Sequence, residues 1–145
     1  MAEFQLDPSL ALGSVSLAEL SLSSVRLMDD SRFPWLMVIP RRPGAREIFD
    51  LLRSDQEQLL KELALAADVV RALGLITGRP VEKLNLGALG NVTPQLHWHV
   101  VGRRQDDACW PGPVWGQGTS IPYPPAMLAR CVEVGGNGFP DIRAR

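Results

Sequence analysis

A long amphipathic helix places the strongest constraint on the fold of this chain. Apolar residues recur at steps of three and four, the spacing of one helix face, at Leu59, Leu60, Leu63, Ala66, Ala67, Val70 and Leu73. The spacing predicts a helix from Ser54 to about Leu73, with Ser54 and Glu57 as an N-terminal capping box and Gly74 as the stop. A single apolar face must be buried, so we expect it to pack on a sheet.

The strands of that sheet are expected on both sides of the helix. Ser24–Met28 and Trp35–Ile39 are predicted as a hairpin, because a short polar turn separates them. Lys83–Ala88 is predicted to pair antiparallel with the segment after Leu89–Pro94. Antiparallel strands around one long helix indicate an α+β domain.

The two ends of the chain carry weaker patterns. Residues 1–22 give no firm assignment, apart from a short helical turn that can start at Asp7-Pro8-Ser9. Pro124 or Pro125 is expected to open a short C-terminal helix through about Val134. We therefore expect a single domain over residues 1–134 and a flexible tail over residues 135–145.

Composition limits the partners that this chain can have. Its 145 residues are the usual length of one domain, and its net charge of −1 and pI near 6.1 argue against general binding of long nucleic acids or membrane surfaces. The N-terminus lacks the pattern of a secretory signal, and no apolar run reaches membrane-spanning length. Two cysteines fit reduced thiols, so a soluble cytoplasmic protein is expected.

The chemistry is concentrated in Gln95–Val101, which contains both histidines of the chain. Leu96, Trp98 and Val100 alternate with Gln95, His97 and His99, as in a half-buried strand. The alternation predicts that Gln95, His97 and His99 face one cleft. A neutral imidazole is a competent nucleophile near pH 7 when its second nitrogen is held as N–H by an acceptor such as a backbone carbonyl.

Two other interpretations of the histidines remain open. A His-x-His pair can chelate a metal, but neither Cys109 nor Cys131 stands at a recognisable metal spacing from it. Both rings can also be partly buried polar groups whose neighbours satisfy them. No metal or cofactor is predicted.

QLHWHVV, with Gly90 and Asn91 before it, resembles the signature of the histidine triad (HIT) family, in which three histidines alternate with apolar residues. Gln95 stands in the place of the first histidine. Trp35 stands where the family often has another histidine, and we expect this replacement to remove a polar partner from the site. The resemblance implies a sheet of about five strands, a homodimer and a nucleotide substrate.

The resemblance also implies the residue roles. His97 would attack the α-phosphorus of a nucleotide, His99 would bind or stabilise the phosphate, and Asn91 and Asn85 would contact the nucleotide. The expected function is a nucleotide-phosphate hydrolase or nucleotidyl transferase with a nucleotidyl-histidine intermediate. Diadenosine polyphosphates or nucleoside phosphoramidates are the expected substrates.

The alternative is a nucleotide-binding protein of this fold with little turnover, serving as a sensor or interaction module. It arises because Gln95 and Trp35 leave only two imidazoles in the site, and an amide cannot hold a titrating proton. The irregular segment Ala108–Gly116 is expected either to cover the sheet or to place Trp110 or Trp115 beside the ligand.

Overall fold

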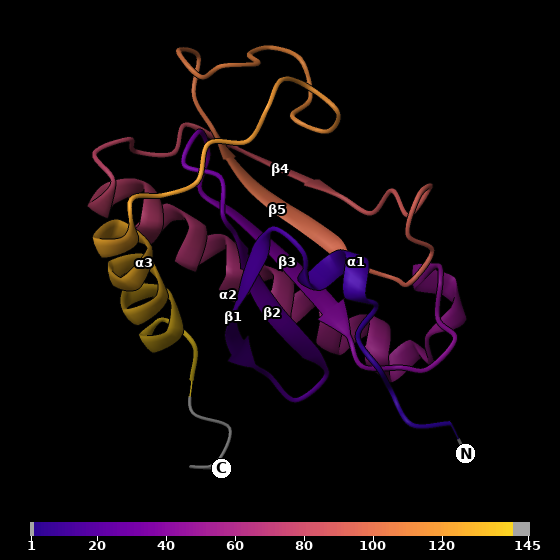
Figure 1. Cartoon of the computed structure of the whole chain (residues 1–145). Helices are drawn as coiled ribbons and strands as arrows, with labels where there is room; N and C mark the ends of the chain where they lie inside the picture. The colour runs from indigo at the N-terminus through magenta and orange to yellow at the C-terminus, as the bar shows by residue number, and fades with distance from the viewer. Residues whose placement is uncertain (1, 141–145) are drawn as a thin grey trace.

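The computed structural model describes residues 2–140, and its centre is a five-stranded antiparallel sheet in the order β1-β2-β3-β5-β4 (Figure 1). The strands are β1 (Ser14–Glu19), β2 (Ser23–Met28), β3 (Trp35–Pro40), β4 (Lys83–Gly87) and β5 (Trp98–Arg103). The hairpin of β2 with β3 and the antiparallel pairing of β4 with β5 confirm the sequence predictions. β1, which the sequence left unassigned, forms one edge and β4 the other.

The helices complete an α+β fold. They are α1 (Pro8–Ala11), α2 (Arg53–Ile76) and α3 (Pro125–Asn137), and a 3-10 turn, Ile48–Asp50, precedes α2. In Figure 1, α2 runs behind the sheet and α1 lies in front of it. α2 contacts β3, β5 and α3, so one long helix and one short C-terminal helix lie on the sheet as predicted. No helix among residues 2–140 combines the length and apolar composition needed to cross a bilayer.

The apolar face of α2 forms the main core. Leu59, Leu63, Ala66, Val70 and Leu73 are buried in one cluster with Leu36 and Val38 of β3 and Val100 of β5, as the helical spacing predicts. Leu60 is the exception, because 70% of it is exposed. The buried face of α2 therefore differs from the predicted one, because it lacks Leu60 and includes Val69.

The predicted ends of α2 are wrong by one residue at the start and by three at the end. The helix begins at Arg53, and Leu52 occupies the cap position without a side-chain hydrogen bond, so Ser54 does not cap it. Gly74 lies inside the helix, where a Cβ would come within 2.8 Å of the Arg79 carbonyl oxygen. The left-handed glycine after the helix is Gly78, at φ +74°. Gly74 is needed for close packing and Gly78 for the turn.

The C-terminal helix is longer than predicted. Pro125 occupies its first turn as expected, but α3 continues to Asn137, and Gly135 packs so closely on Leu17 that a Cβ there would lie 3.1 Å from it. Phe139 is also buried. The helix therefore ends three residues after the predicted Val134, while the division into a domain and a tail at residue 135 stays a prediction, and residues 141–145 of that tail lie outside the described residues.

Candidate active site

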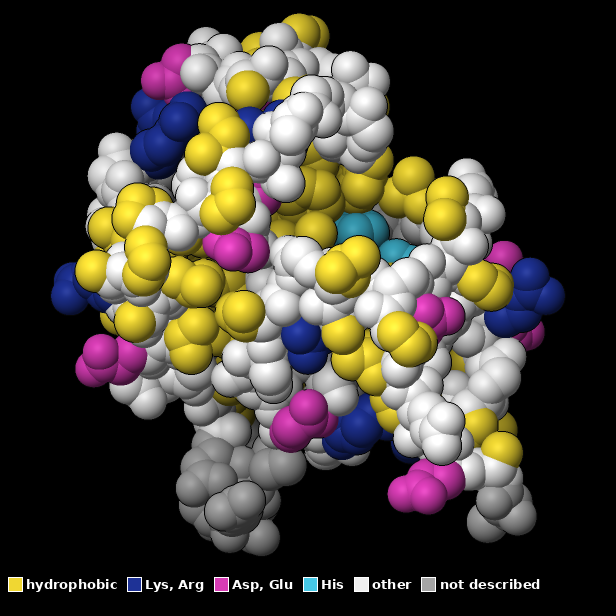
Figure 2. Space-filling view, in the orientation of Figure 1, with side chains coloured by type: hydrophobic (Ala, Val, Ile, Leu, Met, Phe, Trp, Pro, Cys, Tyr) yellow, Lys and Arg dark blue, Asp and Glu magenta, His cyan; other side chains and the backbone are white. Residues whose placement is uncertain are grey.

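Both histidines line a cavity of about 390 Å³ at one end of the sheet. The rest of the lining comes from residues 89–93, before β5, and from Trp115 and Gly116, after it. Figure 2 shows the histidine side chains in a depression with apolar side chains around it. Among the described residues, those that line this cavity include no Asp, Glu, Lys or Arg.

The strand prediction is correct for the side chains of His97 and His99 and their apolar neighbours, wrong for the Gln95 side chain, and partly wrong for the backbone. β5 begins at Trp98, so Gln95 to His97 precede it, because the Leu96 N–H donates to the Ala45 carbonyl instead of joining the ladder. Leu96 and Val100 are nevertheless buried, and Trp98 packs against the same core. His97 and His99 face the cavity together, with ring centroids 5.0 Å apart.

His97 is oriented by its own backbone. Its Nδ1 lies 2.7 Å from the carbonyl oxygen of Gln95. A carbonyl only accepts, so Nδ1 donates and carries the proton, and Nε2 is left with a free lone pair. This is the arrangement that a nucleophilic imidazole requires.

His99 has the opposite proton arrangement. The indole Nε1–H of Trp35 donates to His99 Nδ1 at 2.9 Å. An indole nitrogen only donates, so Nδ1 of His99 is unprotonated and its proton is on Nε2. Burial, and then the neighbouring His97, lowers the pKa of His99 to about 4, so the ring is neutral at pH 7. Trp35 therefore supplies a polar partner to the site, and the expectation that it removes one is wrong.

Trp115 covers His99 from the side of the loop that follows β5. Its ring meets the imidazole edge to face, with centroids 5.5 Å apart. Trp110 instead lies over the Arg103 guanidinium, 5.6 Å from ring centroid to Cζ, and does not line the cavity. Of the two tryptophans in the irregular segment, Trp115 is thus the one beside the histidines.

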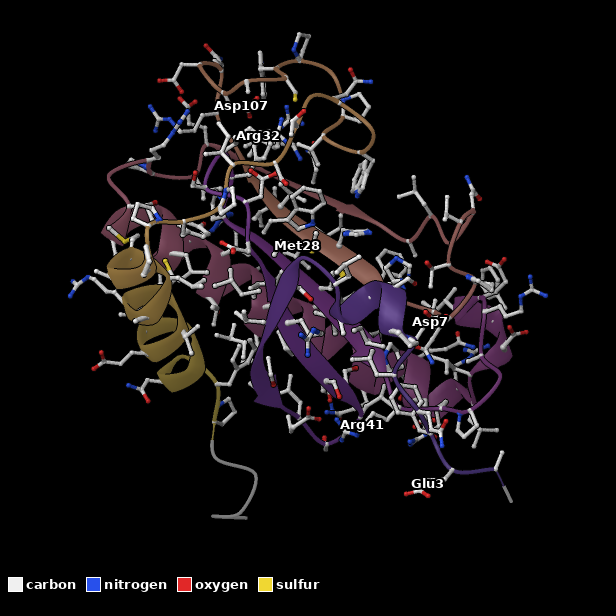
Figure 3. All side chains as sticks on the ribbon, viewed as in Figure 1. Glu3, Asp7, Met28, Arg32, Arg41 and Asp107 are labelled. Carbon is white, nitrogen blue, oxygen red and sulfur yellow. The ribbon has the colours of Figure 1, made fainter. Side chains whose placement is uncertain are left out.

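A buried ion pair fixes the start of the Trp115 loop, in the region where Figure 3 labels Asp107. Arg103 donates to Asp107 through Nε and Nη2, and the side chains are only 1% and 2% exposed. The same carboxylate accepts from the backbone N–H groups of Arg104, Cys109 and Trp110. Burial alone would raise the pKa of Asp107, but the hydrogen bonds from Arg103 and this backbone outweigh it and lower the pKa to about 2.

The structure brings together only some of the predicted site residues. Asn91 lines the cavity with His97 and His99. The Gln95 side chain does not line it, because its amide donates to the Gln5 carbonyl at 2.8 Å and accepts from the Asp7 N–H at 2.9 Å. Asn85 accepts from Arg103 at 2.8 Å and also lies outside the cavity lining.

Sequence reasoning missed one residue at the site and misjudged the effect of another. Thr93 lines the cavity, and its hydroxyl lies 2.7 Å from that of Ser9 in α1. Trp35 reaches the site through the pairing of β3 with β5, where Met37 is opposite His99. The polar type of Thr93 in the lead-in to the histidines was a usable signal, whereas the role of Trp35 depends on the register between two distant strands.

The comparisons with known proteins agree with this fold. The model of the HIT domain matches residues 12–106. A histidine triad protein from Bradyrhizobium japonicum is 35% identical, with a TM-score of 0.86 and coverage of 94% of this chain and 98% of that one. One from Sinorhizobium meliloti is 40% identical, with a TM-score of 0.83 and coverage of 94% and 97%. No curated protein matches.

A third relative, a histidine triad protein from Marinobacter aquaeolei, is 36% identical, with a TM-score of 0.84 and coverage of 94% of this chain and 96% of that one. The chain therefore belongs to the histidine triad family. Its five-stranded α+β fold is the one that the signature implied.

Proposed function

We propose that this protein binds nucleotides and acts at their α-phosphate as a hydrolase or nucleotidyl transferase, with His97 as the nucleophile. The observation that carries the proposal is the hydrogen bond from His97 Nδ1 to the Gln95 carbonyl, which leaves Nε2 free to attack. His97 is 7% exposed, so most of the ring is shielded from water at the wall of the cavity. Family membership supports the same chemistry.

The reaction has two steps. In the first, the Nε2 lone pair of His97 forms a bond to the α-phosphorus while the bond from phosphorus to the leaving group breaks, and the leaving group takes its proton from water. In the second, water attacks the phosphorus and the N–P bond breaks, and the proton that this water releases neutralises the hydroxide left by the first step, which returns neutral His97 and a nucleoside monophosphate. An alcohol or amine in place of water would give transfer instead of hydrolysis.

The remaining site residues receive supporting roles. His99 donates Nε2–H to a phosphate oxygen, and Asn91 donates to the same phosphate. Gln95 acts through its backbone carbonyl, which orients His97, while its side chain holds the N-terminal segment. Asn85 does not contact the nucleotide in this proposal; it accepts a hydrogen bond from Arg103 and helps to hold that side chain.

The substrate class, the cellular location and the oligomeric state belong to the same proposal. Diadenosine polyphosphates and nucleoside phosphoramidates both place a leaving group on an α-phosphate, and either fits this chemistry. A cytoplasmic homodimer is proposed from the family resemblance and from the two free cysteines.

A single-turnover assay separates this proposal from a binding module with little turnover. With label on the α-phosphate, we expect the protein to acquire label through an acid-labile bond, and with label only in the leaving group it should not. His97→Asn should abolish the labelled intermediate and retain nucleotide binding, because Asn keeps polar contacts but lacks the nucleophilic nitrogen.

Cys109→Ser is the matched control. Cys109 is the half-buried thiol of the chain and does not line the cavity of the histidines. The Cys109→Ser variant should acquire label at the parent rate. Turnover at the parent rate by His97→Asn, in a preparation free of contaminating phosphatase, would exclude the covalent mechanism. Binding without any labelled protein would favour the binding module.

A further inference from the structure

The hydrogen bond between Trp35 and His99 joins two buried side chains on neighbouring strands. Trp35 and His99 are each 7% exposed, and their ring centroids are 5.6 Å apart. The Nε1 to Nδ1 distance of 2.9 Å is that of a well-formed hydrogen bond. Met37 of β3 lies opposite His99 in the ladder, so strand register holds Trp35 two pairs away from His99 and on the same face of the sheet.

This bond constrains protonation as well as position. A histidine partner can donate or accept, but an indole N–H can only donate. An imidazolium carries hydrogen on both nitrogens, so a charged His99 would set its Nδ1–H against the indole N–H. The hydrogen bond therefore exists only with the neutral ring, and only with the tautomer protonated on Nε2.

The surroundings offer no charge that would favour a protonated His99. Trp115 covers the ring edge, and Gly87 of β4 and Met37 of β3 are its partners in the two ladders. Among the described residues that line the cavity, His97 is the only other titratable group, and its effect opposes a positive charge on His99. Trp35 is the only hydrogen-bond donor assigned to His99 Nδ1 within the described part of the chain.

We propose that Trp35 is a positioning residue: its indole N–H holds Nδ1 of His99 unprotonated, so that His99 stays an uncharged ring and presents Nε2–H to the cavity. The assigned role of that Nε2–H, donation to a phosphate, rests on the proposed function. The protonation state does not, and it can be measured without any substrate.

The direct test uses the parent protein labelled with ¹⁵N. The chain has only two histidines, so the imidazole signals are few. At pH 7 we expect His99 to have an unprotonated Nδ1 and a protonated Nε2, with a scalar coupling across the hydrogen bond between Trp35 Nε1 and His99 Nδ1. A proton on His99 Nδ1 at pH 7 overturns the proposal, whatever the activity of the protein.

A pair of variants then tests the role of the indole N–H. Trp35→Phe keeps an aromatic ring and removes the donor. We expect the pKa of His99 to rise by about one unit, the size of one neutral hydrogen bond, and both neutral tautomers to be populated. An unchanged His99 titration in Trp35→Phe means that Trp35 does not control the proton, and it overturns the proposal.

Trp98→Phe is the matched control. Trp98 adjoins both histidines in sequence but packs into the core, and its Nε1 has no hydrogen-bond partner among residues 2–140. The His99 titration of this variant should match that of the parent. Since Trp98→Phe loses a similar volume without losing a bond to His99, it separates the effect of the donor from that of repacking.

Turnover provides a second readout. Trp35→Phe should lower kcat/KM by about threefold to tenfold at pH 7, the size of one lost hydrogen bond, and should lose further activity at acid pH as His99 becomes protonated. Trp98→Phe should keep the parent pH profile. A parent protein that binds nucleotide without turnover would remove the proposed function, while the spectroscopic result would still decide the role of Trp35.

Discussion

Gly87 lies directly beneath Trp115, opposite His99 in the β4–β5 ladder. A Cβ at this position would be 3.2 Å from Trp115 Cη2, tighter than an ordinary contact. The absent side chain therefore allows Trp115 to approach the imidazole. Lys83, Asn85 and Gly87 share one side of β4, because they are two residues apart along the strand.

Gly87→Ala should displace Trp115 from His99. We expect nucleotide affinity to fall by about twofold to tenfold, the size of one aromatic contact. Calorimetric titration with a nucleoside monophosphate, together with tryptophan fluorescence, measures the change.

Gly136→Ala in α3 is the control, since its Cβ would meet only the Leu17 carbonyl at 3.4 Å and alanine favours a helix. This variant should bind as the parent does. Equal affinities for both variants and the parent would show that the position of Trp115 does not matter for binding.

Among the single residues, Gln95 and Trp35 show what the local sequence pattern can and cannot predict. The alternation placed His97 and His99 in one cavity, because side-chain direction along a chain is a local property. Gln95 bonds to residues 88 and 90 positions away, and Trp35 to one 64 positions away. Partners so distant are known only once the strand order and the course of the N-terminal segment are known.

Among the elements, the loop after β5 depends on a single carboxylate. Asp107 accepts from the Arg103 guanidinium and from three backbone N–H groups, and through them it sets the start of the segment that carries Trp115. The N–H groups of an irregular loop need such acceptors when they are buried.

Asp107→Asn should destabilise the protein strongly, because it leaves the buried Arg103 charge without its counterion. We expect the free energy of unfolding to fall by about 3–5 kcal/mol, as measured by urea denaturation. Asp106→Asn is the neighbouring control, because Asp106 pairs with Arg104 and Arg79 at the exposed surface. Its effect should be small. Similar losses for the two variants would contradict the role assigned to the buried pair.

Periodicity predicted the elements better than their ends. The α2 stripe and the β2–β3 hairpin follow from spacings of side chains, whereas the start of α2 at Arg53 and the continuation of α3 to Asn137 depend on packing. Gly74 and Gly135 resemble helix stops in sequence, yet each lies in a helix where another segment approaches closely. A glycine in the sequence alone does not show whether it ends a helix or allows close packing within one.

For the whole molecule, the buried neutral His99 makes stability depend on pH. The pKa of His99 is about 4 in the folded protein against an ordinary value of 6.5, so the unfolded chain binds more protons between these values. Stability should therefore be fully present above pH 6.5 and should fall as the pH drops to 4, by up to about 3 kcal/mol.

Asp107 extends the loss of folding stability to lower pH. Its pKa of about 2 lies below the ordinary 3.8, so its contribution to stability is present above pH 4 and is lost as the pH falls toward 2.

Urea denaturation at pH 7.5, 5.5 and 4 measures the effect of His99 on stability, and His99→Gln should show a smaller loss of stability across this range. A parent stability that is constant from pH 7 to 4 would contradict the buried neutral ring.

The two hydrogen bonds to the imidazoles are formed before any ligand arrives. One ring already offers a lone pair and the other an N–H, and the partners that decide this are a backbone carbonyl and an indole on the adjoining strand. In the proposed reaction, neither ring has to change its tautomer when a phosphate enters, which keeps the reorganisation energy of the two imidazoles small. The fold orients the two rings in advance, so that the cavity presents a hydrogen-bond acceptor at His97 Nε2 and a donor at His99 Nε2.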